Sequence, residues 1–207
     1  MRFIFVRHPQ TVSNVQRRLT GVGNSPYTEE GVKQAEAIIK FLSTAAYDRI
    51  YSSPIERALH IGKSVSENLE AELNVVTWLQ EINFGDLEGL CDADFEEKGI
   101  KIEEYRNNFK NRFPNGESWH EFYELKKENI EEIKNEEGVC LCTSHGGAIW
   151  ALSNALLGSE LGDFQGLFIN NASIIIIDYD NGIGKIVKRI DIDDIMQGKE
   201  TIFNYLE

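Results

Sequence analysis

Two short apolar runs, far apart in the chain, are each followed almost at once by a histidine. Residues 3–6 precede Arg7 and His8, and residues 139–142 precede Thr143, Ser144 and His145. Each run has the length and composition of a buried strand. Because open α/β sheets place ligand sites beyond the carboxyl ends of their strands, we expect both histidines at that edge of one sheet.

Strand and helix signals alternate along the rest of the chain. The expected strands are residues 2–6, 48–52, 74–78 and 139–143, and a closing hairpin joins 173–179 to 184–190 through Asn181-Gly182. The expected helices begin after the cap Thr28, at about residue 54, at residue 119 and near residue 146. This order predicts an α/β three-layer sandwich, with a mostly parallel central sheet and helices on both faces.

Two of the helix starts carry explicit capping signals. Ser53-Pro54-Ile55-Glu56 combines a capping box with proline at the first helical position, which predicts a helix over about 54–69. Arg57 would then lie in the first turn, where a cation opposes the helix dipole unless an anion binds there. A second capping box, Ser118-Trp119-His120-Glu121, opens a helix that reaches about residue 135.

Composition excludes several classes of protein. The length of 207 residues suits a single domain over 1–207, with short helices forming a cap region around 90–116. The net charge of −13 opposes nonspecific binding to nucleic acid or to an anionic membrane. The apolar run at residues 3–6 is too short for a signal peptide or a membrane span, so we expect a cytoplasmic protein. Cys140 and Cys142 alternate as strand residues do, which favours buried thiols over a metal or redox pair.

The segment after the first strand carries groups suited to phosphate. The Arg7 guanidinium offers a planar fork for phosphate oxygens, and Thr11 and Asn14 can add neutral hydrogen bonds. A neutral His8 ring can act as a nucleophile through its free nitrogen. The alternative interpretation is a polar transition from strand to loop.

Two further segments can complete such a site. Glu81 is flanked by Leu79, Ile82 and Phe84, which would desolvate its carboxyl group, favour the protonated form and suit it to general acid catalysis. The alternative is a solvated turn, and we expect the neighbouring Glu88 to face water. Gly146 opens a helix directly after His145, and a helix start of this kind can hold a phosphate.

Six motifs, in order, resemble those of the histidine phosphatase superfamily, which is also called phosphoglycerate mutase-like. The resemblance runs from residue 2 to about residue 152. The matching segments are Arg7-His8-Pro9-Gln10-Thr11 with Asn14, Ser25-Pro26-Tyr27-Thr28, Ser52 through Ala58, Glu81 to Gly89, Gly116-Glu117-Ser118 and Ser144 to Gly147.

The resemblance implies a role for each matched residue. His8 would be the nucleophile that becomes phosphohistidine, and Glu81 would be the proton donor. Arg7, Arg57 and His145 would form the phosphate pocket, and Asn14 would touch the phosphate or the substrate. The resemblance implies no metal, which agrees with the lack of ligand spacing among the His and Cys residues of this sequence, and we expect no other cofactor for the favoured function.

The resemblance leaves three functions to compare. A metal-independent phosphomonoesterase acting on a small phosphorylated metabolite is favoured, because the stretch between Glu81 and Gly116 is short and leaves water access. The second is a cofactor-dependent phosphoglycerate mutase. The third is a noncatalytic phosphate-binding module, which should have lost His8 or Glu81. Pro9 stands where the family motif has glycine, and neither the alcohol nor the oligomeric state follows from the sequence.

Overall fold

The computed structural model describes residues 1–161 and 169–206, and within them one mixed sheet organises the chain. Its strand order is β3-β2-β4-β1-β5-β6. β1 to β4 run parallel to their neighbours among themselves, whereas β5 is antiparallel to both β1 and β6. The expected, mostly parallel sheet is confirmed. The strands are β1 (Arg2–Arg7), β2 (Arg49–Ser52), β3 (Leu73–Val75), β4 (Val139–Ser144), β5 (Ile174–Asp180) and β6 (Ile183–Ile190).

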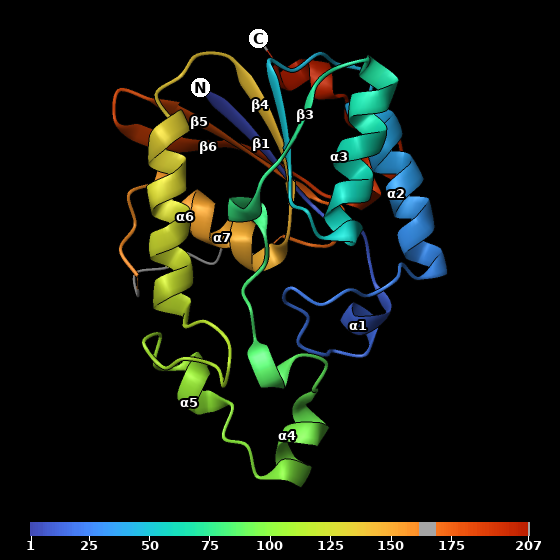
Figure 1. Cartoon of the computed structure of the whole chain (residues 1–207). Coiled ribbons are helices and arrows are strands. Elements are labelled where there is room, and N and C mark those ends of the chain that lie inside the picture. The colour runs from blue at the N-terminus through green and yellow to red at the C-terminus, as the bar shows by residue number, and fades with distance from the viewer. Residues whose placement is uncertain (162–168, 207) are drawn as a thin grey trace.

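Helices cover both faces of this sheet (Figure 1), as expected. Phe3 and Phe5 of β1 pack in one core with α6 and α7, while Ile4 and Val6 pack in a second core with α2 and α3. β1 is therefore buried on both faces, which explains its unbroken apolar run. The helices are α1 (Val12–Val15), α2 (Glu29–Leu42), α3 (Glu56–Leu69), α4 (Asp92–Lys98), α5 (Glu103–Arg106), α6 (Trp119–Ile133), α7 (Gly146–Leu156) and α8 (Ile192–Met196).

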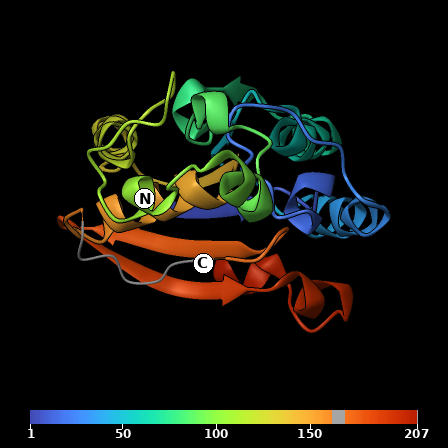
Figure 2. The same ribbon diagram turned by 90° about the horizontal axis from the view of Figure 1, so that it is seen from below.

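Most of the expected elements are confirmed. Thr28 caps α2 and Ser118 forms the predicted capping box of α6. Asn181 and Gly182 both have positive φ, as the tight turn of the β5–β6 hairpin requires. This hairpin and the C-terminal helices lie along one side of the molecule (Figure 2). The buried positions predicted for Cys140 and Cys142 on β4 are confirmed, and both thiols are free.

Two boundaries were predicted wrongly. The strand expected over 74–78 ends at Val75, because the chain enters a 3₁₀ turn at Thr77–Leu79 and the Trp78 ring packs against Tyr51. The capping box expected at 53–56 does not form. The Ser53 N–H extends the sheet by donating to Thr143 O, so α3 begins only at Glu56, with Ile55 as its N-cap.

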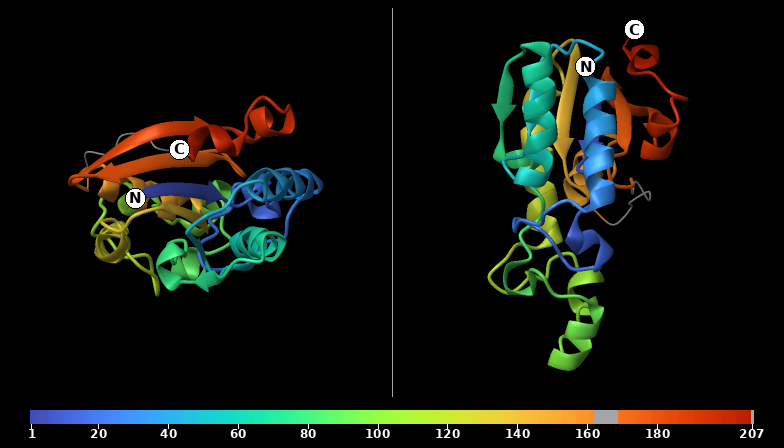
Figure 3. Two further views of the ribbon diagram at one scale, coloured as in Figure 1. Left: turned by 90° about the horizontal axis from the view of Figure 1, so that it is seen from above. Right: turned by 90° about the vertical axis from the view of Figure 1, so that its right-hand side faces the viewer.

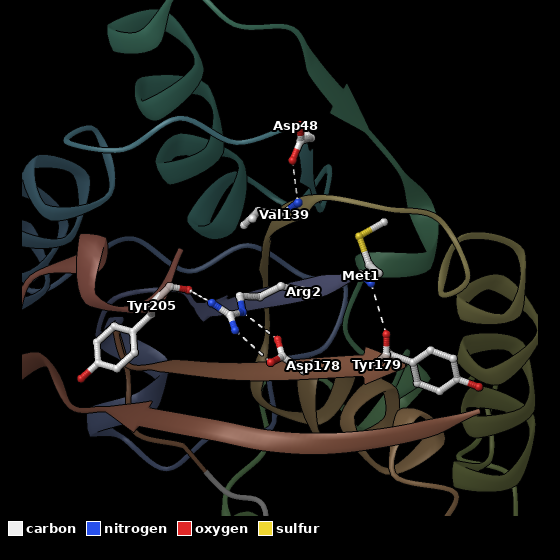
Figure 4. Close-up of polar contacts among 7 residues, drawn as sticks. All are labelled: Met1, Arg2, Asp48, Val139, Asp178, Tyr179 and Tyr205. Carbon is white, nitrogen blue, oxygen red and sulfur yellow. Dashed lines mark hydrogen bonds and ion pairs between the residues drawn. The ribbon is translucent and has the colours of Figure 1, made fainter. Parts of the chain in front are cut away.

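Ionic and polar contacts close the amino end of the sheet (Figure 4). The Arg2 guanidinium pairs with Asp178 through Nε and Nη2, at 2.6 and 2.9 Å, and also donates to the Tyr205 carbonyl. Asp48 accepts from Val139 N–H at 2.7 Å, which ties the start of β4 to the segment before β2. Both termini lie at this end. This arrangement leaves the carboxyl ends of β1, β2 and β4 free for other groups.

Short helices occupy the opposite end of the molecule. α1, α4 and α5 lie there, and α4 extends away from the sheet (Figure 3, right). α4 and α5 fall in the stretch 90–116, where short helices were expected. Among the helices of the described residues, none has both the length and the apolar character needed to cross a membrane.

Candidate active site

The strand register brings the two histidines level with each other. β1 and β4 are neighbours in the middle of the sheet, and Arg7 pairs with Ser144 at their carboxyl ends. His8 N–H donates to Ser144 O at 3.0 Å, and the His8 and His145 ring centroids lie 5.3 Å apart. Both side chains are buried. The expected meeting of these histidines at one sheet edge is confirmed.

The His8 ring is held in a single orientation by the next residue. Its Nδ1 lies 2.7 Å from the Pro9 carbonyl oxygen, so Nδ1–H donates and Nε2 keeps its lone pair. Burial, with the charges of Arg57 and Arg7, lowers the pKa of His8 well below its usual range. A neutral ring with a free Nε2 is the form that a nucleophile requires.

Arg57 is held by the backbone of a loop far away in the sequence. Its Nη1 donates to Gly23 O at 2.7 Å and its Nη2 to Gly21 O at 2.6 Å. The Glu88 carboxylate accepts from the N–H groups of Gly21 and Val22 and thereby fixes this loop. The expectation that Glu88 faces water was wrong, because these backbone donors draw its carboxylate inward. The loop carbonyls in turn aim the buried guanidinium.

Arg7 is likewise held by a backbone carbonyl. Its Nη1 donates to Ile169 O at 2.7 Å, and its guanidinium lies against Gly146, where an added Cβ would be 3.3 Å from Cζ. Gly146 thus allows Arg7 to lie close to the start of α7. Burial lowers the pKa of Arg7, although the charge of Glu81 opposes this shift.

Three buried nitrogens have no hydrogen-bond partner among the described residues of the site. They are Nε of Arg7, Nε of Arg57 and Nδ1 of His145. A buried donor without an acceptor costs about 1–3 kcal/mol. Since these atoms come from three separate segments next to His8, the arrangement fits a missing multivalent acceptor such as a phosphoryl group.

Ser53 makes a contact with His145 that the sequence does not predict. Its hydroxyl lies 2.8 Å from His145 Nε2. The local pattern predicts a helix-cap role for Ser53, but the pairing of Ser52 with Thr143 places Ser53 beside His145 at the sheet edge. Burial, with the charges of Arg57 and His8, lowers the pKa of His145 well below its usual range.

Thr11 and Asn14 are tied to each other by a capping box. The Thr11 hydroxyl donates to Asn14 Oδ1 at 3.0 Å and accepts from Asn14 N–H. Asn171 Nδ2 also donates to Asn14 Oδ1, at 3.0 Å, and to the His8 carbonyl, at 3.1 Å. These bonds orient Asn14 so that its amide nitrogen can serve another acceptor. The Thr11 hydrogen is already engaged, so a phosphate contact from Thr11 stays a prediction that this geometry does not favour.

The Glu81 carboxylate is half-buried and held by two backbone groups. Oε2 accepts from Gly147 N–H at 2.9 Å, and Oε1 accepts from Ile82 N–H at 3.0 Å. Its neighbours Leu79, Ile82 and Phe84 are buried in the core, as expected, and they anchor the segment. A Cβ on Gly147 would lie 2.3 Å from Oε1. Glycine at the start of α7 therefore lets the Glu81 carboxylate lie against the first turn of this helix.

Comparison with known proteins agrees with this geometry. The model of the histidine phosphatase superfamily (branch 1) matches residues 3–192. The chain belongs to this superfamily. A relative from Hydrogenobacter thermophilus, named "Putative phosphoserine phosphatase 2", is 30% identical over 84% of this chain and 87% of its own length.

Solved structures show the same histidine phosphatase fold. The alpha-ribazole phosphatase from Shigella flexneri superposes with a TM-score of 0.80 at 23% identity, covering 92% of this chain and 96% of that one. A mycobacterial glucosyl-3-phosphoglycerate phosphatase in complex with VO3 gives a TM-score of 0.79 at 26% identity, covering 89% and 96%.

One further feature of this histidine phosphatase was missed. Lys126 of α6 is only 2% exposed, and its Nζ lies 4.4 Å from the centroid of the Phe122 ring. Burial lowers the pKa of Lys126 to about 8, against the opposing charges of Glu81 and Glu117. A lysine on an amphipathic helix normally faces water, so helical periodicity does not mark this position.

Replacing Arg57 with lysine should lower kcat/KM by about 10²–10³-fold, the effect of losing one oxyanion donor. An ammonium group cannot satisfy the two loop carbonyls and also present an Nε–H. We expect similar losses for chemically different phosphate esters and weaker inhibition by vanadate. Arg49→Lys is the matched control. Arg49 lies at the opposite end of β2 and pairs with Glu136, so this variant should change neither kcat/KM nor the inhibition by vanadate. A changed substrate ranking with unchanged vanadate inhibition would place Arg57 in the alcohol pocket.

Proposed function

We propose that this superfamily member hydrolyses a small phosphate monoester through a phosphohistidine at His8, without a metal or another cofactor. The observation that carries the proposal is the set of three buried nitrogens, on Arg7, Arg57 and His145, that lack a hydrogen-bond partner among the described residues and belong to side chains close to His8. A phosphoryl group would supply the acceptor that all three lack. The relatives named as phosphatases support the same class of reaction.

In the first step His8 Nε2 attacks phosphorus. An N–P bond forms, the bond from phosphorus to the alcohol oxygen breaks, and a proton from the Glu81 carboxyl group passes to that oxygen. Arg7 and Arg57 stabilise the charge on the equatorial phosphoryl oxygens. Because Glu81 is held by Gly147 and Ile82, its carboxyl group stays on the alcohol side of the site.

In the second step water replaces the alcohol. The ionised Glu81 takes a proton from water, the water oxygen attacks phosphorus, and the N–P bond breaks to restore neutral His8. Glu81 is therefore the acid in the first step and the base in the second. The low pKa of His8 suits this cycle, since a ring that stays unprotonated can attack again.

A panel of phosphomonoesters tests this function directly. We expect phosphate release from at least one ester, ranked by kcat/KM, and unchanged rates after dialysis against EDTA. Restoration only by Mg²⁺ or Zn²⁺ would contradict the metal-independent reaction. Isomerisation of phosphoglycerate that needs bisphosphoglycerate priming, with no phosphate release, would instead identify a mutase.

The remaining assignments are part of the same proposal. We propose a cytoplasmic protein whose partner is a small phosphorylated substrate, with no nucleic acid or membrane partner. The net charge of −13 supports the last two points, because it opposes nonspecific binding to nucleic acid and to an anionic membrane. A small anionic substrate needs only a local basic pocket, which Arg7 and Arg57 would provide. We also propose that residues 1–207 act as one domain with the stretch 90–116 as a short cap.

A further inference from the structure

Ser53 and His145 share a hydrogen bond in a fully buried place. Both residues have 0% exposure, and Ser53 Oγ lies 2.8 Å from His145 Nε2. The sheet fixes this distance, because Ser53 N–H donates to Thr143 O at 3.0 Å, two residues before His145, which is the N-cap of α7. Since both side chains are buried, the position of the shared proton is set by the protein groups around them.

The other bond of the Ser53 hydroxyl decides which atom carries that proton. Ser53 Oγ accepts from Ile55 N–H at 3.2 Å. If His145 Nε2 also donated to Oγ, the oxygen would receive two N–H groups, and its own hydrogen would need a different acceptor. Among the described residues, the bonds found for Ser53 Oγ are those to Ile55 and His145. Full satisfaction therefore requires the Ser53 O–H to donate to Nε2.

We propose that Ser53 is a positioning residue that sets the tautomer of His145, keeping Nε2 unprotonated and the ring proton on Nδ1. Nδ1 of His145 is buried and has no partner among the described residues, as is also true of Nε of Arg7 and Nε of Arg57. His145 can then donate one N–H bond to a phosphoryl oxygen while it remains neutral. The identity of that acceptor rests on the proposed function, but the tautomer of the free protein does not.

The chain offers a matched control one residue earlier. Ser52 is as buried as Ser53, accepts from Thr143 Oγ1 at 2.8 Å and donates to the Ser53 carbonyl at 2.9 Å. Ser52→Ala thus removes a buried, hydrogen-bonded hydroxyl from the same segment and leaves the partner of His145 in place. A general loss of packing would affect both variants, whereas tautomer selection belongs to Ser53 alone.

The test is ¹⁵N NMR of the ligand-free protein with labelled histidines, in which comparison with His145→Asn identifies the His145 signals. In the wild type we expect the proton on Nδ1 of a neutral ring. In Ser53→Ala we expect a shift towards the Nε2–H form, and in Ser52→Ala no change. A wild-type ring protonated on Nε2, or a Ser53→Ala spectrum equal to that of the wild type, would overturn the proposal.

Binding of inorganic phosphate gives a second readout. Ser53→Ala should raise its dissociation constant about tenfold, the scale of one hydrogen bond to a charged group, whereas Ser52→Ala should not. Equal binding by Ser53→Ala and wild type would count against the proposal. If Ser53→Ala does not fold, the wild-type spectrum alone decides. A wild type that releases phosphate from no ester would refute the proposed function and leave the tautomer assignment standing.

Discussion

Replacing His8 with alanine should reduce phosphate release to the background rate, a loss on the order of 10⁴–10⁶-fold, as is typical of losing a nucleophile. The structure holds the His8 ring through Pro9, next to the His145 ring and close to the charges of Arg7 and Arg57. An acid-labile phosphoryl group should appear on wild-type protein quenched during turnover, and mapping of the phosphopeptide should place it on His8.

The control for this variant is His60→Ala. His60 is exposed on α3, and its ring contacts Tyr27 at 5.7 Å between centroids, so its removal should leave turnover unchanged. The thermal midpoint of His8→Ala should stay close to that of the wild type, because the backbone bonds of His8 to Ser144 and Ala172 remain. Phosphate mapped to any other residue would remove His8 from the nucleophile role.

Replacing Glu81 with glutamine should reduce turnover of alkyl phosphates by roughly 10²–10⁴-fold, the span of general acid catalysis. An alkyl alcohol leaves poorly unless it is protonated as the bond to phosphorus breaks. A nitrophenolate leaves without help, so the loss in the phosphorylation step should be smaller for an aryl ester. In the proposed second step Glu81 also activates water, so the variant should accumulate phosphoenzyme with the aryl substrate. Single-turnover phosphorylation, measured with both leaving groups, separates the two steps.

Gly147→Ala provides a second way to disturb the proton donor. The new Cβ would lie 2.3 Å from Glu81 Oε1, so the carboxylate must move although its chemistry is unchanged. We expect the same selective loss for alkyl esters, in a smaller amount. Equal losses for alkyl and aryl esters in Glu81→Gln, without phosphoenzyme, would make Asp86 or Glu88 the next candidate. Of these two, Glu88 fits the role of proton donor less well, since its carboxylate already accepts from the N–H groups of Gly21 and Val22.

The parts of the site that lie at strand ends could be predicted from sequence. A buried strand has a local signature, and the residue that follows it must emerge at the sheet edge, so the meeting of His8 with His145 follows from two local patterns and one rule of topology. The same holds for the caps of α2 and α6, because a side chain and an N–H three residues away form each of them.

Contacts between distant segments could not be predicted in this way. Ser53 satisfies the local pattern of a helix cap, yet pairing with β4 takes its N–H and brings its hydroxyl to His145. Glu88 satisfies the pattern of a solvated turn, yet loop 20–23 supplies the N–H groups that draw it inward. In both cases a tertiary partner overrides a local preference, and no property of the segment itself reveals the partner.

The two histidines follow the two innermost strands of the sheet, β4 and β1, each of which has a ladder partner on both sides. Amide protons in such strands exchange with solvent only when the whole sheet opens, whereas surface loops and short helices open locally. The part of the site that we propose for the phosphoryl group therefore shares the stability of the entire fold. In the stretch 90–116, outside the sheet, Phe95, Ile102 and Phe113 are buried in the core, but the exposed positions can change in sequence at little cost to that stability. A chain built in this way can acquire a new alcohol specificity while its phosphoryl chemistry stays fixed.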